Sequence, residues 1–137
     1  MKTEILKITP EHPETDALRY CAEVIRGGGL VAFPTETVYG LGANAFDDAA
    51  VRKIFAAKNR PADNPLIVHI SDYGMLQGVA AFAGAQETRL RQLGKVYWPG
   101  PLTMIVGKDP KIPPAVSCGL DTVGIRMPVH PGARALI

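Results

Sequence analysis

The chain has 137 residues, of which 47% are hydrophobic and 20% charged, and its formal net charge is +2. These values are typical of an ordinary globular domain, and the length suits one domain with a moderate core. No apolar run approaches the roughly 18 residues of a membrane span, so we expect neither a span nor a signal peptide. The charge is too small to indicate nucleic-acid binding by itself.

Cysteines and histidines show no metal-binding pattern. Cys21 and Cys118 are isolated, which favours reduced thiols and a cytoplasmic protein. His12 and His130 have no ligand spacing around them, and His69 lies within an apolar run. We therefore expect no resident metal site.

The first elements are marked by a helical pattern and a glycine run. Thr15 can cap a helix whose apolar positions follow helical spacing. Glycines 27–29 end that helix, because glycine accepts the left-handed conformation of a helix stop. A short apolar strand over 30–33 follows directly.

A second helix and strand complete the first half. Asp47 or Asp48 caps the helix, which ends near Lys58 because Pro61 disfavours helical geometry just before it. The apolar run 66–70 then predicts a buried strand.

The second half continues the mixture of helices and strands. A helix over 86–96 is predicted to turn Leu90 and Leu93 inward. The alternation over 122–127 predicts a strand with one face in the core. This mixture indicates a single α/β domain. The remaining segments are predicted as a weak helical stretch after Ser71, a strand over 102–106, a loop over 108–118 and the first turns of a helix over 134–137.

The segment 33–42, FPTETVYGLG, is the strongest functional signal. A polar loop directly after a strand lies at the edge of the sheet, where α/β folds usually bind ligands. The hydroxyls and the carboxylate of Thr35, Glu36 and Thr37 can equally serve local turn hydrogen bonds. A buried phenol at Tyr39 would need a polar partner, and a ligand can supply one.

Two further sets of residues point to anionic ligands. Lys58 and Arg60 can neutralise phosphates, although a lysine at a helix C-terminus also complements the helix dipole. No Walker-type phosphate loop is present. Arg126 faces away from the core side of its strand, beside Thr122. It could grip a carboxylate with two hydrogen bonds or simply be a surface arginine.

Four motifs, over 33–42, 58–65, 98–103 and 123–128, resemble those of the YrdC-type threonylcarbamoyl-AMP synthases. The resemblance runs from about residue 5 to residue 137. It implies a single domain with a YrdC-like twisted open mixed sheet flanked by helices and a polar cleft. Family members continue with a Ser-Ala-Asn segment that helps to hold ATP. We therefore expect 1–137 to be a synthase domain that lacks its C-terminal part, is a poor catalyst and tends to form a homodimer.

The resemblance also assigns roles to individual residues. It implies that L-threonine contacts the hydroxyl loop, the apolar-strand histidine and the outward arginine, and that ATP contacts the basic motif and the start of the last strand. The implied sets are Thr37, His69 and Arg126 for L-threonine, Lys58 and Arg60 for catalysis, and Arg60, Asn64 and Thr122 for ATP.

The activity that the resemblance implies is a nucleotidyl transfer. L-threonine, bicarbonate or CO2, and ATP, with Mg2+, would give threonylcarbamoyl-AMP and pyrophosphate for the modification of tRNA by downstream transfer enzymes. Two alternatives stay open: an RNA-binding module for tRNA or double-stranded RNA without catalysis, and a carbamoyl-transfer domain of the hydrogenase-maturation type. Saturable binding of threonine, steep salt dependence of RNA binding, or use of carbamoyl phosphate would distinguish them.

Overall fold

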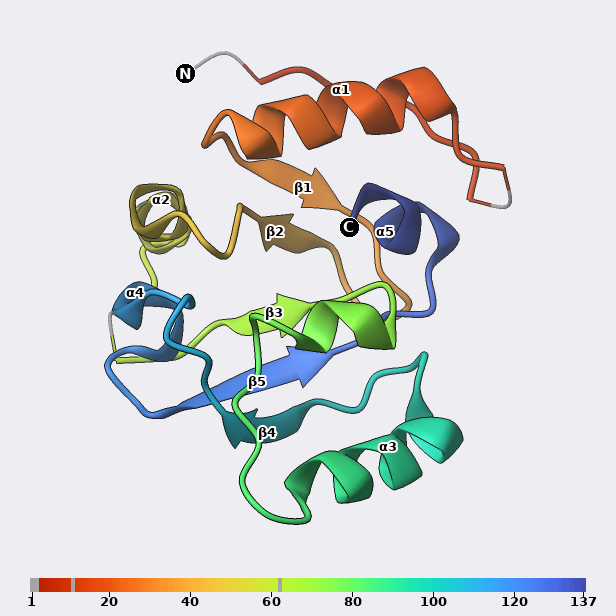
Figure 1. The fold of residues 1–137 in the computed structure, drawn as a ribbon. Coiled ribbons are helices and arrows are strands. Elements are labelled where there is room, and N and C mark those ends of the chain that lie inside the picture. Colours follow the sequence, from red (N-terminus) through yellow and green to blue (C-terminus); the bar gives the residue numbers. More distant parts are fainter. Residues whose placement is uncertain (1–2, 11, 62) are drawn as a thin grey trace.

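A computed structural model describes residues 3–10, 12–61 and 63–137 (Figure 1). Residue 62, which belongs to the 58–65 motif, lies outside the described residues. Helices and strands alternate along the chain, so the predicted α/β class is confirmed. The elements are α1 (Thr15–Arg26), β1 (Val31–Phe33), β2 (Gly40–Gly42), α2 (Asp48–Lys58), β3 (Ile67–His69), the 3-10 helix η1 (Tyr73–Leu76), α3 (Gln86–Tyr97), β4 (Met104–Gly107), α4 (Pro114–Ser117), β5 (Thr122–Arg126) and α5 (Pro131–Leu136).

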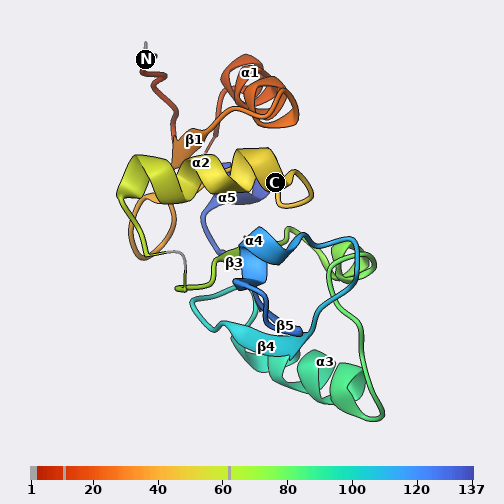
Figure 2. The same cartoon turned by 90° about the vertical axis from the view of Figure 1, so that its left-hand side faces the viewer.

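The strands form two separate sheets. β1 and β2 are an antiparallel pair, and β3, β5 and β4 form a mixed sheet in which β5 is central. β3 runs parallel to β5, whereas β4 runs antiparallel to it. The hairpin lies among α1, α2 and α5, and α3 covers the far side of the three-stranded sheet (Figures 1 and 2).

The core lies between the three-stranded sheet and the elements that follow β3. Alternate residues of β5 point into it, because successive side chains of a strand face opposite ways. Val123, Ile125 and Met127 are all buried, as predicted. Burying apolar side chains on this one face is the main contribution to the stability of the sheet. The other buried members are Val51, Val68, Ile70, Leu76, Val79, Leu90, Trp98, Met104, Val106, Ile112 and Val116.

The opposite face of this sheet is open in its middle. Ile67 of β3 and Ile105 of β4 are both register partners of Gly124 on β5, so the three form one row across the sheet. Ile67 is 45% exposed and Ile105 73% exposed. Thr122 and Arg126 lie on this same face, two residues to either side of Gly124.

The predicted N-terminus of α1 is wrong by one residue. Glu14 is the N-cap and makes no capping hydrogen bond. Its carboxylate instead accepts hydrogen bonds from the backbone and the hydroxyl of Thr9. Asp47, by contrast, caps α2 as predicted, with its side chain accepting from Ala50 N–H.

The prediction that Leu93 faces the core is also wrong, since Leu93 is 47% exposed. The inner face of α3 is instead formed by Leu90 and Gly94, which are both buried. Gly94 lies against the ring of Tyr73, so an aromatic side chain packs closely on the inner face of α3.

Three boundaries were missed for local reasons. The segment 40–42 was assigned to a loop because its two glycines have low strand propensity, yet it pairs with β1. The short α4 lies within the predicted loop 108–118, where Pro114 occupies the first helical turn. α5 begins at Pro131, with the ring nitrogen of His130 accepting from Gly132 N–H, and so starts before the predicted residue 134.

Candidate active site

Arg126 is the centre of a polar cluster between the two sheets. Its Nη2 donates to Glu36 Oε1 at 2.6 Å and to Thr37 Oγ1 at 3.2 Å, and its Nε donates to the carbonyl of Gly100 at 3.3 Å. The second carboxylate oxygen of Glu36 accepts from Val129 N–H at 3.2 Å. The loop between β1 and β2 thus reaches down to the end of β5 (Figure 1).

The ion pair between Glu36 and Arg126 is largely removed from solvent. The side chain of Arg126 is 12% exposed and that of Glu36 is 20% exposed. Desolvation has the largest single effect on the Glu36 pKa and would raise it. The hydrogen bond from Arg126, backbone N–H groups and the Arg126 charge oppose it, and together they lower the pKa below its ordinary value. Glu36 is therefore ionised at neutral pH.

His69 lies beside Arg126 because the two residues are register partners on β3 and β5. Its ring meets Phe33 edge-on at a centroid distance of 6.2 Å, and Nδ1 lies 3.3 Å from the carbonyl oxygen of Ile67. Burial lowers the pKa of His69, and the Arg126 charge lowers it further. A neutral imidazole therefore lies next to the guanidinium.

The three residues that the resemblance assigned to threonine are thus brought together by the fold. Thr37, His69 and Arg126 come from a loop and two different strands. Within the described residues, Nη1 of Arg126 donates no hydrogen bond, so two N–H groups remain for an incoming carboxylate.

The hydroxyl loop itself combines turn chemistry with binding groups. Thr35 Oγ1 accepts from the backbone N–H groups of Thr37 and Val38, which is a local turn arrangement. The expectation of a buried phenol is wrong, because Tyr39 is 76% exposed. The turn fixes the backbone from which Glu36 and Thr37 reach Arg126.

Arg60 and Asn64 form a second cluster before β3. Arg60 Nη2 donates to Asn64 Oδ1 at 2.6 Å and to the Pro65 carbonyl at 2.9 Å, and Nε donates to the Asn64 carbonyl at 2.9 Å. The guanidinium therefore ties Arg60 to the backbone and side chain of Asn64 and to the backbone of Pro65. Lys58, the last residue of α2, is exposed.

Thr122 lies at the other end of β5 from Arg126. The two residues are four steps apart along the strand, about 13 Å at the usual rise per residue. The row of Ile67, Gly124 and Ile105 lies between these two positions. The threonine set and Thr122 therefore share one sheet face but are separated by an apolar strip.

The remaining basic residues of α2 have internal partners. Arg52 Nε lies 2.6 Å from Asp48 Oδ2, and Lys53 Nζ donates to the carbonyl of Gly28 at 2.6 Å. Arg52 and Lys53 thus have partners within the protein, which weakens the case for this helix as an RNA-binding surface.

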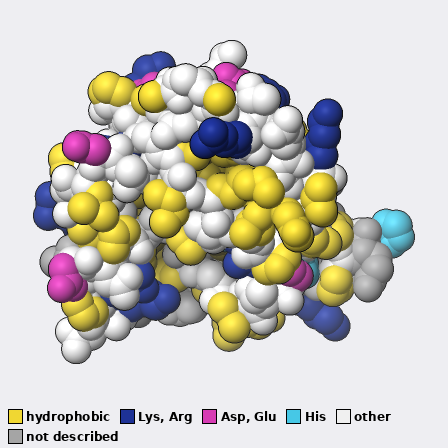
Figure 3. Space-filling view, turned by 90° about the horizontal axis from the view of Figure 1, so that it is seen from below, with side chains coloured by type: hydrophobic (Ala, Val, Ile, Leu, Met, Phe, Trp, Pro, Cys, Tyr) yellow, Lys and Arg dark blue, Asp and Glu magenta, His cyan; other side chains and the backbone are white. Residues whose placement is uncertain are grey.

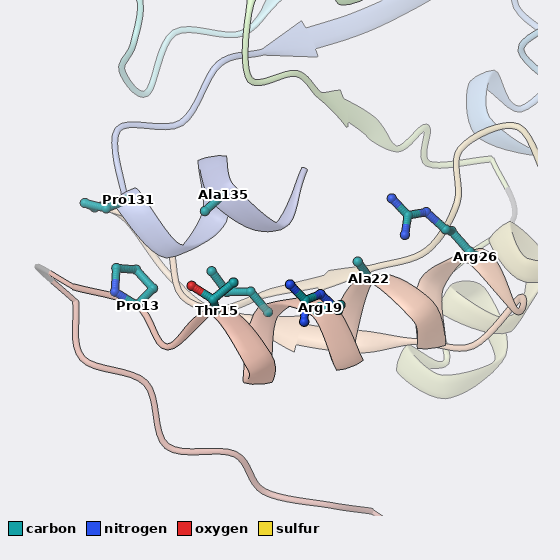
Figure 4. Close-up of a pocket in the computed structure, with 8 residues that line it drawn as sticks. Pro13, Thr15, Arg19, Ala22, Arg26, Pro131 and Ala135 are labelled. Atoms are coloured by element: carbon teal, nitrogen blue, oxygen red, sulfur yellow. The ribbon is translucent and has the colours of Figure 1, made fainter.

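A separate hollow lies away from this polar cluster. A cavity of about 550 Å³ opens between α1 and α5, lined by Leu18, Ala22, Ala135 and their neighbours (Figure 4). None of its lining residues belongs to the predicted site, and its walls offer mainly Arg19 and Arg26 as charged groups. We assign the site by converging polar groups rather than by this hollow.

The described residues contain neither a metal-binding cluster nor a helix able to span a membrane. Across 3–10, 12–61 and 63–137, no group of three or more His, Cys, Asp or Glu side chains is placed to hold a metal ion. No helix in the same ranges has the length and hydropathy needed to cross a bilayer.

Comparison with known proteins agrees with this geometry. The sequence profile of the Sua5/YciO/YrdC family, described as telomere recombination, matches residues 23–137. The chain belongs to the Sua5/YciO/YrdC family. This confirms the resemblance found in the sequence motifs.

Three members of the Sua5/YciO/YrdC family illustrate the similarity. The threonylcarbamoyl-AMP synthase of Pyrococcus abyssi is 52% identical over 93% of this chain and 36% of its own length. That of Bacillus subtilis is 48% identical over 100% of this chain and 40% of its own length. The structure of P. abyssi Sua5 in complex with L-threonine superposes with a TM-score of 0.91 at 48% identity, over 98% of this chain and 38% of that one. The chain thus spans well under half of these relatives.

Sequence reasoning named the loop that carries Glu36 but gave that residue only a turn role. Its partner Arg126 is 90 positions away. The sequence did contain a sign of this ion pair. Glu36 is an acidic residue next to Thr37, and Thr37 was expected to share a site with the outward-facing Arg126.

Proposed function

We propose that this chain acts as an L-threonylcarbamoyladenylate synthase, a nucleotidyltransferase. It joins L-threonine, bicarbonate or CO2, and ATP to give threonylcarbamoyl-AMP and pyrophosphate, with one water released when bicarbonate supplies the carbon. The observation that carries the proposal is the convergence of Thr37, His69 and Arg126, with Nη1 of Arg126 turned to no protein acceptor among the described residues. A related structure solved with L-threonine supports it.

The proposed chemistry needs little covalent participation by the protein. The carbamate oxygen of carboxylated threonine attacks the α-phosphorus of ATP, and pyrophosphate leaves. Arg126, through Nη1, and Thr37 hold the α-carboxylate, and neutral His69 offers a hydrogen bond to the substrate. Holding two anions in contact in a fixed orientation supplies most of the acceleration.

Lys58, Arg60, Asn64 and Thr122 are proposed to serve the nucleotide. Lys58 is exposed and can follow the phosphates, whereas Arg60 is already oriented by Asn64. Because the described residues form no metal cluster, Mg2+ would enter with the triphosphate and take most of its ligands from phosphate and water.

The proposal extends to the product and to the surroundings of the protein. Threonylcarbamoyl-AMP would pass to transfer enzymes that modify tRNA. A cytoplasmic location is supported by the two free thiols, Cys21 and Cys118. A homodimer is supported by hydrophobic side chains that gather on the face of α3, where Leu93, Val96 and Tyr97 are exposed (Figure 3). Light scattering tests this last part.

Titration calorimetry with L-threonine tests the core of the proposal. Arg126→Ala removes a charge-assisted contact and should weaken threonine binding by about 2–3 kcal/mol. Arg52→Ala, which removes an equal charge from the exposed face of α2, should leave the affinity unchanged. Equal affinity of the Arg126 variant and the parent chain would rule out the assignment.

A further inference from the structure

Glu36 is a charged residue of the site for which the proposed reaction has no role, and its side chain is 20% exposed. Among the ion pairs between described residues, its pair with Arg126 alone joins distant parts of the chain, and the others are exposed pairs within a helix. Both of its oxygens are engaged, one by Arg126 and one by Val129 N–H. A carboxylate can accept about four hydrogen bonds, so acceptor capacity remains.

The pair changes how a substrate carboxylate can be held. The Nε and Nη2 edge of Arg126 is occupied by the Gly100 carbonyl, Glu36 and Thr37. The bidentate grip expected from the sequence is thus made partly to a carboxylate of the protein itself. A ligand carboxylate meets only Nη1, directly beside the negative charge of Glu36.

The charge balance of the cluster then determines which ligands fit. Arg126 and Glu36 cancel, and His69 is neutral, so the site has no net charge. A simple carboxylate would bring an unbalanced negative charge into a largely desolvated site, which is costly. A zwitterion places its carboxylate on Arg126 and its ammonium near Glu36, and both charges are compensated.

We propose that Glu36 is a specificity residue that selects a zwitterionic α-amino acid over a simple carboxylate, by balancing Arg126 and accepting a hydrogen bond from the substrate ammonium. This inference rests on the proposed function and deepens it. The carbamoylated amine no longer carries a positive charge. The same carboxylate therefore favours the substrate over the product and helps the product to leave.

Calorimetry with two ligands tests the proposal. L-threonine carries the ammonium, whereas 3-hydroxybutyrate has the same carboxylate and hydroxyl without it. Wild-type protein should prefer L-threonine by at least about tenfold, and Glu36→Gln should reduce that preference by about tenfold or more. Glu36→Asp, which keeps the charge, should retain most of it. Asp48→Asn removes a carboxylate from the exposed pair with Arg52 and should change nothing.

The outcomes separate the two proposals. If Glu36→Gln weakens both ligands equally, Glu36 only holds Arg126 in place, and the specificity role is overturned while threonine binding stands. Equal binding of the two ligands to wild-type protein overturns it without any variant, so a variant that fails to fold does not block the test. No threonine binding by wild-type protein overturns this inference and the proposed function together.

Discussion

Lys58 and Arg60 are two residues apart, but their side chains have different surroundings. Lys58 is an exposed residue at the end of α2. Arg60 makes three hydrogen bonds, to Asn64 and Pro65, just before β3. Removal of the Lys58 side chain should therefore leave the fold unchanged, whereas removal of the Arg60 side chain should destabilise it.

We expect Lys58→Ala to reduce threonine-dependent ATP–pyrophosphate exchange by about 100-fold, because one cationic partner of the phosphates is lost. Its free energy of unfolding should not change. Arg60→Ala should lose similar activity and also about 1 kcal/mol of stability, since its hydrogen bonds to Asn64 and Pro65 disappear. Exchange assays together with urea denaturation measure both effects.

Arg52→Ala is the matched control, because it removes the same charge from the same helix. It should retain exchange activity. Full activity in both the Lys58 and the Arg60 variants, with folding shown by circular dichroism, would exclude the phosphate role.

Single-residue orientation was readable from the sequence only where a local pattern determines it. Alternation along 122–127 placed Arg126 on the open face correctly. The partner that occupies its guanidinium could not be read, because no periodicity links Glu36 to a residue 90 positions later. The exposure of Tyr39 likewise depends on how the hairpin loop meets the second sheet.

At the scale of elements, α3 shows how a neighbouring side chain changes a helical pattern. A Cβ placed on Gly94 would overlap the hydroxyl of Tyr73 and approach its ring. That hydroxyl is buried without a hydrogen-bond partner in the described residues. The glycine thus makes room for an aromatic ring beside Trp98, at a centroid distance of 6.1 Å.

Gly94→Ala tests this packing. In a free helix the change would stabilise by up to about 1 kcal/mol. Here the added methyl group must displace Tyr73, and overpacking of this kind costs about 1–3 kcal/mol. We expect a net loss of stability in urea denaturation. Gln92→Ala, on the exposed face of the same helix, should be neutral or slightly stabilising. A gain in stability for the Gly94 variant would contradict the packing argument.

Element types were predictable wherever composition and periodicity agreed. Helical spacing and the Asp47 cap located α2, and the continuous apolar run located β3. The failures have physical causes. The helical pattern predicts an inward Leu93, but the buried positions of α3 are Leu90 and Gly94, and Gly94 packs against Tyr73. β2 contains two glycines and is a strand because β1 pairs with it, which is tertiary information.

At the scale of the whole molecule, the Glu36–Arg126 pair joins the hairpin to the three-stranded sheet. The loop 34–39 connects the two strands of the hairpin. Arg126 is the last residue of β5 in the three-stranded sheet, and Val129 follows it in the chain. His69 also lies between the two sheets, where its ring contacts Phe33 of the hairpin. The groups proposed to bind threonine are therefore also among the groups that join the hairpin to the three-stranded sheet, which couples the stability of the fold to their ionisation.

The direction of that coupling follows from the pKa shifts. The folded-state pKa of His69 is lowered from its ordinary value of 6.5, chiefly by burial. The pKa of Glu36 is lowered from 4.5, despite its desolvation, by Arg126 and backbone N–H groups. In both cases the unfolded chain binds more protons than the folded one over the affected range, so stability rises with pH there.

We therefore expect the free energy of unfolding to fall in two stages as the solution is acidified. The His69 contribution is fully present above about pH 6.5 and is lost as the pH falls from there towards its folded-state pKa. The Glu36 contribution persists to lower pH and is lost below about pH 4.5. Urea denaturation at a series of pH values measures both stages. His69→Gln should flatten the first stage alone, whereas His12→Gln, at an exposed position, should leave the curve unchanged. If the first stage is equally large in the His69 variant, protonation of His69 does not cause the loss of stability in that pH range.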